Sequence, residues 1–446
     1  MASVPGEVQK ISSSSAVESS PVRFVTAASL FDGHDASINI MRRMLQAAGV
    51  EVIHLGHNRS VREIVNAAVQ EDAHAIAVSS YQGGHVEYFQ YLVDQLAELN
   101  ASHVRVFGGG GGVIIPEEIQ QLHDYGVARI YSPQDGLKLG LQGMIDDMVH
   151  KAAAVSMPVP DIDNLQDSNP VSLARRLTAI ENGVLSSASI NKIRESSAAL
   201  SAVPVLGITG TGGSGKSSLT DELVRRFRLD QNDQLKIALL AVDPTRRKTG
   251  GALLGDRIRM NAIEHPNIFM RSLATRSAGS EVPDYLPDVV AATRLAGFDL
   301  VIVETPGIGQ GDAGIVPLCD VSLYVMTPEF GAASQLEKID MLDFADLIAI
   351  NKLERKGGSD ALRDVAKQVQ RNREAFDRAP SEMPVYGTIA ARFNDDGVTA
   401  LYQSLLDMLK AKGLSPSASQ LDAVAGQHSS RPVSYTHLTL PTILLV

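Results

Sequence analysis

A glycine-rich segment has the residue types and spacing of a phosphate-binding loop. Residues 210–217 read GTGGSGKS and fit G-x-x-x-x-G-K-[ST], between an apolar run and an amphipathic helical stretch. Glycines let backbone N–H groups converge on phosphate oxygens, at the positive end of the following helix. Lys216 can then reach the β- and γ-phosphates, and the Ser217 hydroxyl can ligate Mg²⁺. The predicted nucleotide-binding residues here are Gly212, Gly213, Ser214, Gly215, Lys216, Ser217 and Ser218.

A second motif indicates which base is read. Asn351-Lys352-Leu353-Glu354 follows the apolar run DLIAI and resembles the N-K-x-D motif of G proteins, with glutamate in place of aspartate. A carboxylate can accept both N1–H and N2–H of guanine, a pair of donors that adenine lacks. We therefore expect Asn351, Lys352 and Glu354 to bind GTP, with a geometry adjusted to the longer glutamate.

Acidic residues at predicted strand ends are candidates for holding Mg²⁺. Glu304 ends FDLVIVE, and Asp243 ends LKIALLAVD. Asp256 lies in GGALLGDRIRM beside Arg257 and Arg259, which are candidates to offset phosphate charge. In open parallel sheets such strand ends form the ligand-binding edge. We expect Ser217, Asp243, Asp256 and Glu304 to hold Mg²⁺ or its waters. Lys216, Arg259 and Glu304 are the predicted catalytic residues, which act mainly by positioning and by neutralising charge.

A histidine loop follows the first apolar run of the chain. RFVTAASL leads directly into FDGHDAS, which places His34 at the edge where an open sheet presents its ligand groups. An imidazole there can be a lower axial ligand to cobalt, and Asp32 can accept the other ring N–H and orient the ring. Ser79 ends the third run, and five glycines, residues 108–112, end the fourth. Such small residues would let a planar macrocycle or a buried nucleotide tail approach closely.

The elements that must position these residues alternate between short apolar runs and amphipathic stretches. Five strand-then-helix units in residues 21–142, and six further runs from Val203 onward, predict two open, mostly parallel α/β sheets. We expect a flexible leader at 1–20, a first domain at 21–150, a helical linker at 151–202, a second domain at 203–413 and a tail at 414–446. From about residue 433 (VSYTHLTLPTILLV) the tail has the character of a foreign or frame-shifted end.

Composition excludes several classes of protein. The 446 residues carry 40 basic and 51 acidic side chains, a net charge of −11, which argues against a binder of nucleic acid or membrane surfaces. A single cysteine excludes an intramolecular disulfide and a cysteine zinc cage. The N-terminus lacks the pattern of a signal peptide, and no run approaches the ~18 apolar residues of a spanning helix. We expect a cytoplasmic protein.

The second domain resembles the MeaB-type G-protein chaperones of cobalamin enzymes. The resemblance rests on GTGGSGKSS, AVDPTRRKTGGALLGDRIRM, ETPGIGQ and NKLE, and it covers about residues 203–412. The sequence departs from the family at Pro306 and at Glu354. The resemblance implies slow GTP hydrolysis coupled to the loading or repair of a cobalamin-dependent mutase.

The first domain resembles the cobalamin-binding domains of acyl-CoA mutases, which carry D-x-H-x-x-G, S-x-L and G-G motifs. Asp32 and His34 match the first motif, Ser79 the second, and Gly111 and Gly112 lie in the glycine run that matches the third. Two positions depart from the motifs: Ser37 stands where glycine is usual and Tyr81 where leucine is usual. The resemblance implies that the histidine displaces the benzimidazole of cobalamin, whose tail inserts into the domain.

The order of the two domains is that of the fused isobutyryl-CoA mutases. This resemblance implies a flavodoxin-like cobalamin-binding domain before a P-loop GTPase domain, with adenosylcobalamin and Mg²⁺ as cofactors. It also implies GTP/GDP and an acyl-CoA mutase barrel domain as partners, and a homodimer is a further candidate assembly. Because we find no barrel, we expect this chain to bind cobalamin and hydrolyse GTP but not to convert isobutyryl-CoA to n-butyryl-CoA alone.

Two other functions fit parts of the sequence. A cobalamin carrier or sensor with a GTPase switch would bind both ligands without any mutase role. An ATP-dependent kinase with a receiver-like first domain would use Asp32 as phosphoacceptor, but it leaves the glycine runs unexplained.

Overall fold

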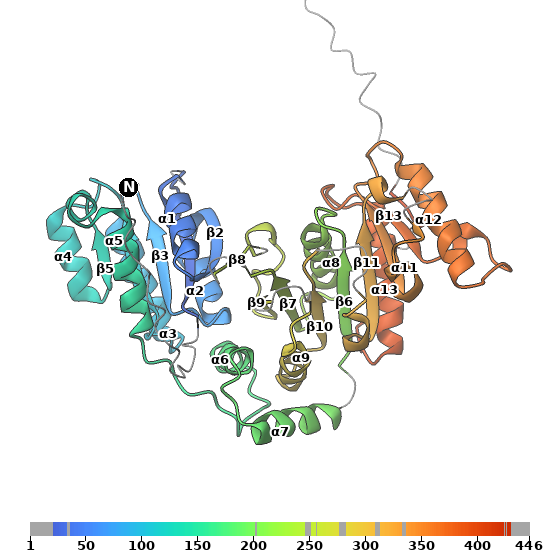
Figure 1. Ribbon diagram of the computed structural model, residues 1–446, viewed down its shortest axis with the longest axis horizontal. Coiled ribbons are helices and arrows are strands. Elements are labelled where there is room, and N and C mark those ends of the chain that lie inside the picture. Colours follow the sequence, from blue (N-terminus) through green and yellow to red (C-terminus); the bar gives the residue numbers. More distant parts are fainter. Residues whose placement is uncertain are drawn as a thin grey trace, which may run out of the picture.

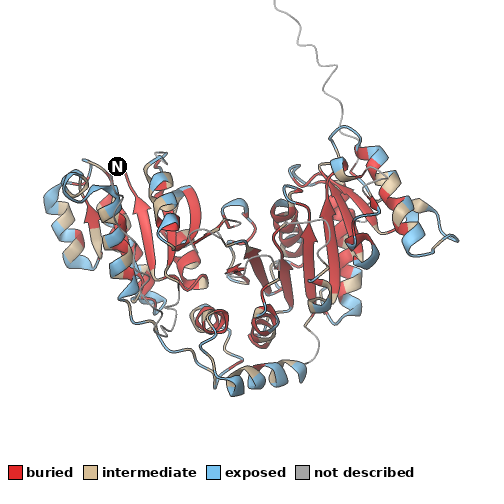
Figure 2. Cartoon of the chain, viewed as in Figure 1, coloured by how far each residue is buried: buried red, intermediate tan, exposed pale blue. Residues whose placement is uncertain are grey.

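Two parallel sheets organise the molecule (Figure 1). The computed structural model describes residues 21–33, 36–200, 203–245, 251–255, 257–275, 282–307, 313–331, 336–422, 424 and 426–429. The strands of both sheets are buried, whereas the helices turn exposed faces outward (Figure 2). Sheets covered by helices on both faces are typical of α/β proteins, so the predicted fold class is confirmed.

The first sheet has the strand order β5-β4-β3-β1-β2-β8. Its strands are β1 (Arg23–Ser29), β2 (Glu51–Arg59), β3 (Ala75–Ser79), β4 (Arg105–Gly109), β5 (Arg129–Tyr131) and β8 (Ala252–Leu254). Helices α1 (Ala36–Ala47) and α5 (Pro133–Ala153) contact each other on one face, and α2 (Val61–Gln70), α3 (His85–Glu98) and α4 (Pro116–Tyr125) cover the other. The five predicted strand-then-helix units are present, and the last helix, α5, continues beyond residue 142, where the predicted pattern ends. Strand order reverses between β1 and β3, which is where such sheets bind ligands.

The second sheet has the order β13-β12-β11-β6-β10-β7-β9. Its strands are β6 (Val205–Gly210), β7 (Ile237–Asp243), β9 (Ile268–Ala274), β10 (Leu300–Glu304), β11 (Val321–Met326), β12 (Leu347–Asn351) and β13 (Val385–Thr388). Helices α8 (Lys216–Asp230) and α13 (Asp396–Ala411) cover one face, and α9 (Leu286–Leu295), α11 (Met341–Phe344) and α12 (Gly358–Asn372) the other. The central strand β6 thus leads into the predicted phosphate-binding loop.

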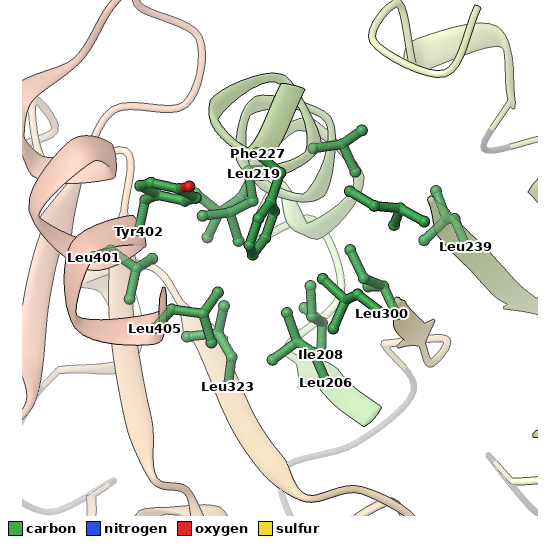
Figure 3. Packing of buried hydrophobic residues seen from close by; sticks show 14 of the residues in the cluster. Leu206, Ile208, Leu219, Phe227, Leu239, Leu300, Leu323, Leu401, Tyr402 and Leu405 are labelled. Carbon is green, nitrogen blue, oxygen red and sulfur yellow. The ribbon is translucent and has the colours of Figure 1, made fainter. Parts of the chain in front are cut away.

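A hydrophobic core beneath this loop packs α8 against the central strand β6 and against α13. Leu206 and Ile208 on β6 pack against Leu219 and Phe227 of α8, and Leu401, Tyr402 and Leu405 of α13 close the cluster (Figure 3). The rings of Phe227 and Tyr402 meet edge to face at 4.9 Å between centroids. Apolar positions at helical spacing on α8 therefore fix the start of the helix against the strand end.

A buried joint connects the two sheets, and it was not predicted. Strand β8 leaves the second domain and pairs in parallel with β2, with Glu51 opposite Ala252 and Ile53 opposite Leu254. Figure 1 shows β8 between the two sheets. Gly255, just after β8, donates its N–H to Asp243 at the end of β7, so the strand that joins the first sheet lies beside the carboxyl end of a strand of the second.

Side chains complete the open edge of β9 at this joint. Gln70 bonds Ile268 O and Met270 N, as a neighbouring strand would. Glu71 accepts from Ser272 N, and Arg23 donates to Ser272 O. The joint comprises six buried charged residues: Arg23, Glu51, Glu71, Glu181, Arg257 and Arg271. Its ion pairs are Arg23 with Glu51, Glu71 and Glu181, Arg257 with Glu71, and Arg271 with Glu181.

The segments predicted as linker and tail also pack against the domains. Helices α6 (Pro170–Glu181) and α7 (Ser187–Ala198) contact α9, and α6 contacts α2 as well. After Gly413, Ser419 and Gln420 bond the buried Asp230, so packed structure continues past the predicted boundary. The expected leader at 1–20 and the unusual end from 433 lie outside the described residues. In the described part of the chain, no helix combines the length and apolarity needed to cross a membrane.

Candidate functional site

The phosphate-binding loop lies between β6 and α8, as predicted. Gly210 has a φ of 149°, and a Cβ atom there would lie 1.9 Å from the Val325 carbonyl oxygen, so the chain can turn here only with glycine. The hydroxyls of Thr211 and Ser214 are buried, and neither has a hydrogen-bond partner within the described chain. Buried hydroxyls are normally bonded, so each leaves a hydrogen-bonding position that a bound group could fill. Ser218 lies exposed in the first turn of α8.

Lys216, Ser217 and Glu304 meet at the start of α8. The Lys216 ammonium donates to the Gly210 carbonyl at 3.1 Å, and the Ser217 hydroxyl donates to Glu304 Oε1 at 2.8 Å. Thr220, which the sequence reasoning missed, donates to Glu304 Oε2 at 2.8 Å. The predicted proximity of Ser217 and Glu304 is therefore present. Because both oxygens of the buried Glu304 accept hydroxyl protons, this carboxylate orients the serine that would ligate Mg²⁺.

The other predicted metal and phosphate residues that the structure describes, Asp243 and Arg259, lie in other segments of the second domain. Asp243 accepts the Gly255 N–H at 3.2 Å, and Asp256 lies outside the described residues. Arg259 is exposed in the short helix Arg257–Arg259. Arg257, which we considered as a partner of phosphate, instead bonds Gln70 and Glu71 in the joint, because its side chain is buried between the domains. Across the described ranges, no three acidic, histidine or cysteine side chains converge as a ready-made metal site. Mg²⁺ sites at phosphates commonly use only one or two protein ligands.

The segment that is predicted to read the base is joined to the phosphate-binding loop by hydrogen bonds. Asn351 is buried; its amide Nδ2 donates to Ser214 O at 2.8 Å, while its Oδ1 accepts from Ala390 N at 3.0 Å. Lys352 donates to Gly213 O at 2.7 Å, and Glu354 is exposed at the start of the following loop. Ala390 was not predicted, since its only signal is a position just after an apolar run. The contacts make Asn351 a positioning residue that holds two loops together.

The first domain has a cavity of about 330 Å³ at the ligand-binding edge of its sheet. Helices α1 and α5 form its walls with the ends of β3 and β4, and Ser79, Gly109, Gly110 and Gly111 line it. The Ser79 hydroxyl is buried without a partner in the part of the chain that the structure describes. An apolar cavity with one unpartnered hydroxyl fits an aromatic base that brings a hydrogen-bonding nitrogen.

Some glycines of the run are required by close packing against neighbouring residues, and others line the cavity. A Cβ atom on Gly108 would lie 2.4 Å from the Phe89 ring, and one on Gly110 would lie 2.0 Å from Ser80 O. Gly111 lines the cavity, as predicted, whereas Gly112 does not line it and has open space where a side chain would stand. The predicted role of Gly112 thus finds no support in this geometry.

Asp32 is buried, and its carboxylate accepts the Tyr81 N–H at 2.7 Å. This contact ties the loop that follows β1 to the loop that follows β3. His34, the predicted cobalt ligand, lies outside the described residues, so its bond with Asp32 stays a prediction.

Comparisons with known proteins match both domains. The family model described as methylmalonyl Co-A mutase-associated GTPase MeaB matches residues 173–421, and the B12 binding domain matches residues 22–132. The fused isobutyryl-CoA mutase of Cupriavidus metallidurans is 65% identical over 92% of this chain and 38% of that protein. Those of Nocardia farcinica and Geobacillus kaustophilus are 61% and 60% identical over 92% and 88% of this chain, and 38% and 37% of theirs. The predicted order of domains is confirmed, and the chain spans well under half the length of these curated relatives.

Proposed function

The chain belongs to the family of methylmalonyl-CoA mutase-associated GTPases, MeaB, and on this premise we propose that it binds cobalamin through its first domain and hydrolyses GTP through its second. The observation that carries the proposal is shared by both ligand-binding edges. The buried hydroxyls of Ser79, Thr211 and Ser214 have no partner in the described chain, although each lies where the sequence motifs predict a ligand.

In the second domain, the residues act on GTP by position and charge. Backbone N–H groups of residues 212–217 would hold the phosphates, and Lys216 would turn from Gly210 O to the β- and γ-phosphates. Ser217, oriented by Glu304, would ligate Mg²⁺, and the ion would supply positive charge at the phosphates. Asp243 and Asp256 are proposed to hold its waters, and Arg259 to offset phosphate charge. Asn351 holds the base-binding loop on Ser214 O, with Lys352 and Glu354 at the guanine.

In the first domain, His34 would ligate cobalt and Asp32 would orient the loop that carries it. Ser79, Gly111 and the neighbouring cavity would hold the nucleotide tail, and Ser79 would donate a hydrogen bond to its base. Cobalamin supplies radical chemistry through its cobalt–carbon bond. The apolar lining of the cavity would exclude water from the tail.

The identity with fused isobutyryl-CoA mutases favours a role in the same reaction class over a carrier or sensor without a mutase. We propose that this chain supplies the cofactor-binding and GTPase parts of an isomerase that converts isobutyryl-CoA to n-butyryl-CoA. The GTPase would support cofactor loading or protection of that mutase. A homodimer and a cytoplasmic location stay predictions, which sedimentation and cell fractionation would test.

Two measurements test the proposal. Phosphate release should be at least tenfold faster with GTP than with ATP, whereas an ATP-dependent kinase predicts the opposite preference. Titration with adenosylcobalamin should give the spectrum of a corrinoid that has lost benzimidazole and gained a protein nitrogen. His34→Ala should lose that nitrogen signal, and His57→Ala, which changes an exposed histidine of the same domain, should keep it. Absence of any corrinoid spectral change in the wild type would refute the cobalamin half.

A further inference from the structure

The two residues that depart from the cobalamin motifs contact each other. The Ser37 hydroxyl and the Tyr81 hydroxyl are 2.9 Å apart, close enough for a hydrogen bond. Ser37 belongs to the first turn of α1, and Tyr81 to the loop between β3 and α3. With glycine and leucine, the residues usual at these motif positions, neither hydroxyl would exist. The two departures therefore form one pair, which we call the Ser37–Tyr81 latch.

The latch lies at the outer end of the cavity. Both residues line the cavity, whose deeper wall includes Ala77 and Phe107 within β3 and β4. Tyr81 comes two residues beyond the last residue of β3, so it stands farther out along the strand direction than Ser79. A Cβ atom on Gly111 would lie 3.0 Å from the Tyr81 ring, which places that ring against the glycine run. The pair thus joins α1 to the loops at the sheet edge, above the unpartnered Ser79 hydroxyl.

We propose that the Ser37–Tyr81 latch must open before the nucleotide tail of a corrinoid can enter the cavity. This inference rests on the proposed cobalamin site and names two residues that govern which corrinoids it admits. A corrinoid with a tail must break the hydrogen bond between the hydroxyls, whereas one without a tail can bind the edge and leave the latch closed. The latch therefore slows and weakens the binding of corrinoids that have a nucleotide tail, and it leaves the binding of corrinoids without a tail unchanged.

The backbone of Tyr81 relates the latch to the histidine loop. Its N–H donates to Asp32, which lies two residues before His34. The side chain of Tyr81 can rotate away from Ser37 while this backbone bond stays in place. Opening the latch therefore requires no displacement of Asp32, so substitutions of the hydroxyls should change tail entry without changing cobalt ligation.

The test compares cobalamin with cobinamide, which lacks the nucleotide tail, in stopped-flow absorbance on the full chain. Tyr81→Phe and Ser37→Ala should each speed the cobalamin phase about two- to tenfold, the worth of one net hydrogen bond. The double variant should be no faster than the quicker single variant, because both changes remove the same bond. Cobinamide binding should be unchanged in all three. Tyr125→Phe, which removes an exposed tyrosine hydroxyl bonded to Asp94 in the same domain, is the matched control.

Each other result overturns the latch. Unchanged or slower cobalamin rates would mean that these hydroxyls do not oppose entry, and a slower rate with weaker affinity would mean that Tyr81 binds the tail. Additive effects of the two substitutions would show that the hydroxyls act separately. Equal acceleration of cobinamide would place the barrier outside the cavity. Failure of the wild type to bind either corrinoid would instead refute the proposed function.

Discussion

The joint between the two sheets and the two ligand-binding edges are both buried and polar, but they differ in what completes them. Each carboxylate of the joint is paired within the chain: Glu181, for example, accepts from Arg23 and Arg271. At the edges, the hydroxyls of Ser79, Thr211 and Ser214 have no partner among the described residues. The comparison teaches that the carboxylates of the joint are paired within the chain, whereas the hydroxyls at the edges leave hydrogen-bonding positions for the ligands that we propose.

Not every polar atom of the joint has a hydrogen-bond partner among the described residues. Arg271 bonds Thr178 and Glu181 through Nη2, while its Nε and Nη1 have no partner in the described part of the chain. Its charge nevertheless stands within 2.8 Å of a Glu181 oxygen, with both side chains fully buried. Removing one partner of such a pair leaves the other charge buried without that compensation, which costs far more than breaking a surface pair.

The largest expected effect comes from breaking the joint. Glu181→Gln should lower the free energy of unfolding by about 3–5 kcal/mol, because Arg23 and Arg271 lose their shared buried carboxylate. Urea unfolding followed by circular dichroism measures this. Glu329→Gln, which changes an exposed pair with Arg355, should cost at most about 1 kcal/mol. Equal effects of the two substitutions would contradict the distinction between joint and surface.

The next largest expected effect is on GTP hydrolysis, and it tests whether the ligand-binding edges of the two domains act independently. Lys216→Ala should lower kcat for GTP hydrolysis by about 10²–10³, the usual cost of losing one charge-stabilising group. Cobalamin affinity, measured on the same protein, should not change. Lys236→Ala, which changes an exposed lysine just before β7, should keep normal activity. Retention of GTP turnover by the Lys216 variant would show that the phosphate loop is not the catalytic edge.

Acid should loosen the joint through His74. This histidine accepts the Arg23 N–H, and burial, together with Arg23, Arg175 and His103, lowers the pKa of its imidazole from 6.5 to about 4. Between these values the unfolded chain binds a proton that the folded chain does not, so stability falls as pH falls from about 6.5 to 4. The expected slope is at most about 1.4 kcal/mol per pH unit.

Unfolding curves at several pH values test this dependence. His74→Asn removes the titrating imidazole, so its free energy of unfolding should change less between pH 6.5 and 4 than that of the wild type. An identical slope in both proteins would assign the acid sensitivity to other groups.

The smallest expected effects come from removing single buried hydroxyls, one without a hydrogen-bond partner in the described chain and one with a partner. Ser79→Ala should leave the stability of the free protein unchanged or slightly higher, because the hydroxyl has no partner there, and should weaken cobalamin binding about three- to tenfold. Ser80→Ala removes a buried hydroxyl that bonds Ser29, so it should cost about 1 kcal/mol of stability. Thermal unfolding and equilibrium titration measure the two quantities. A Ser79 variant that is destabilised but binds normally would reverse the assignment.

Site residues that lie close together along the chain could be predicted from the sequence alone. The phosphate loop, its strand and its helix lie within one short stretch, so spacing and apolar pattern suffice to place Lys216 and Ser217. The same holds for Ser79 at the end of β3 and for the alternation that builds both sheets. Local backbone preferences and the burial of alternate faces decide these features, and both are written in neighbouring residues.

Contacts between distant residues were decided only by the tertiary structure. The bond between Asn351 and Ser214, the pairing of β8 with β2, and the contact of Ser37 with Tyr81 join segments that no spacing rule connects. Arg257 shows the reason: its neighbours along the chain suggested a phosphate partner, but packing of the two domains buried it beside Glu71. A charged side chain pairs with an opposite charge that the fold places nearby. Which residues lie nearby depends on how the two sheets pack together.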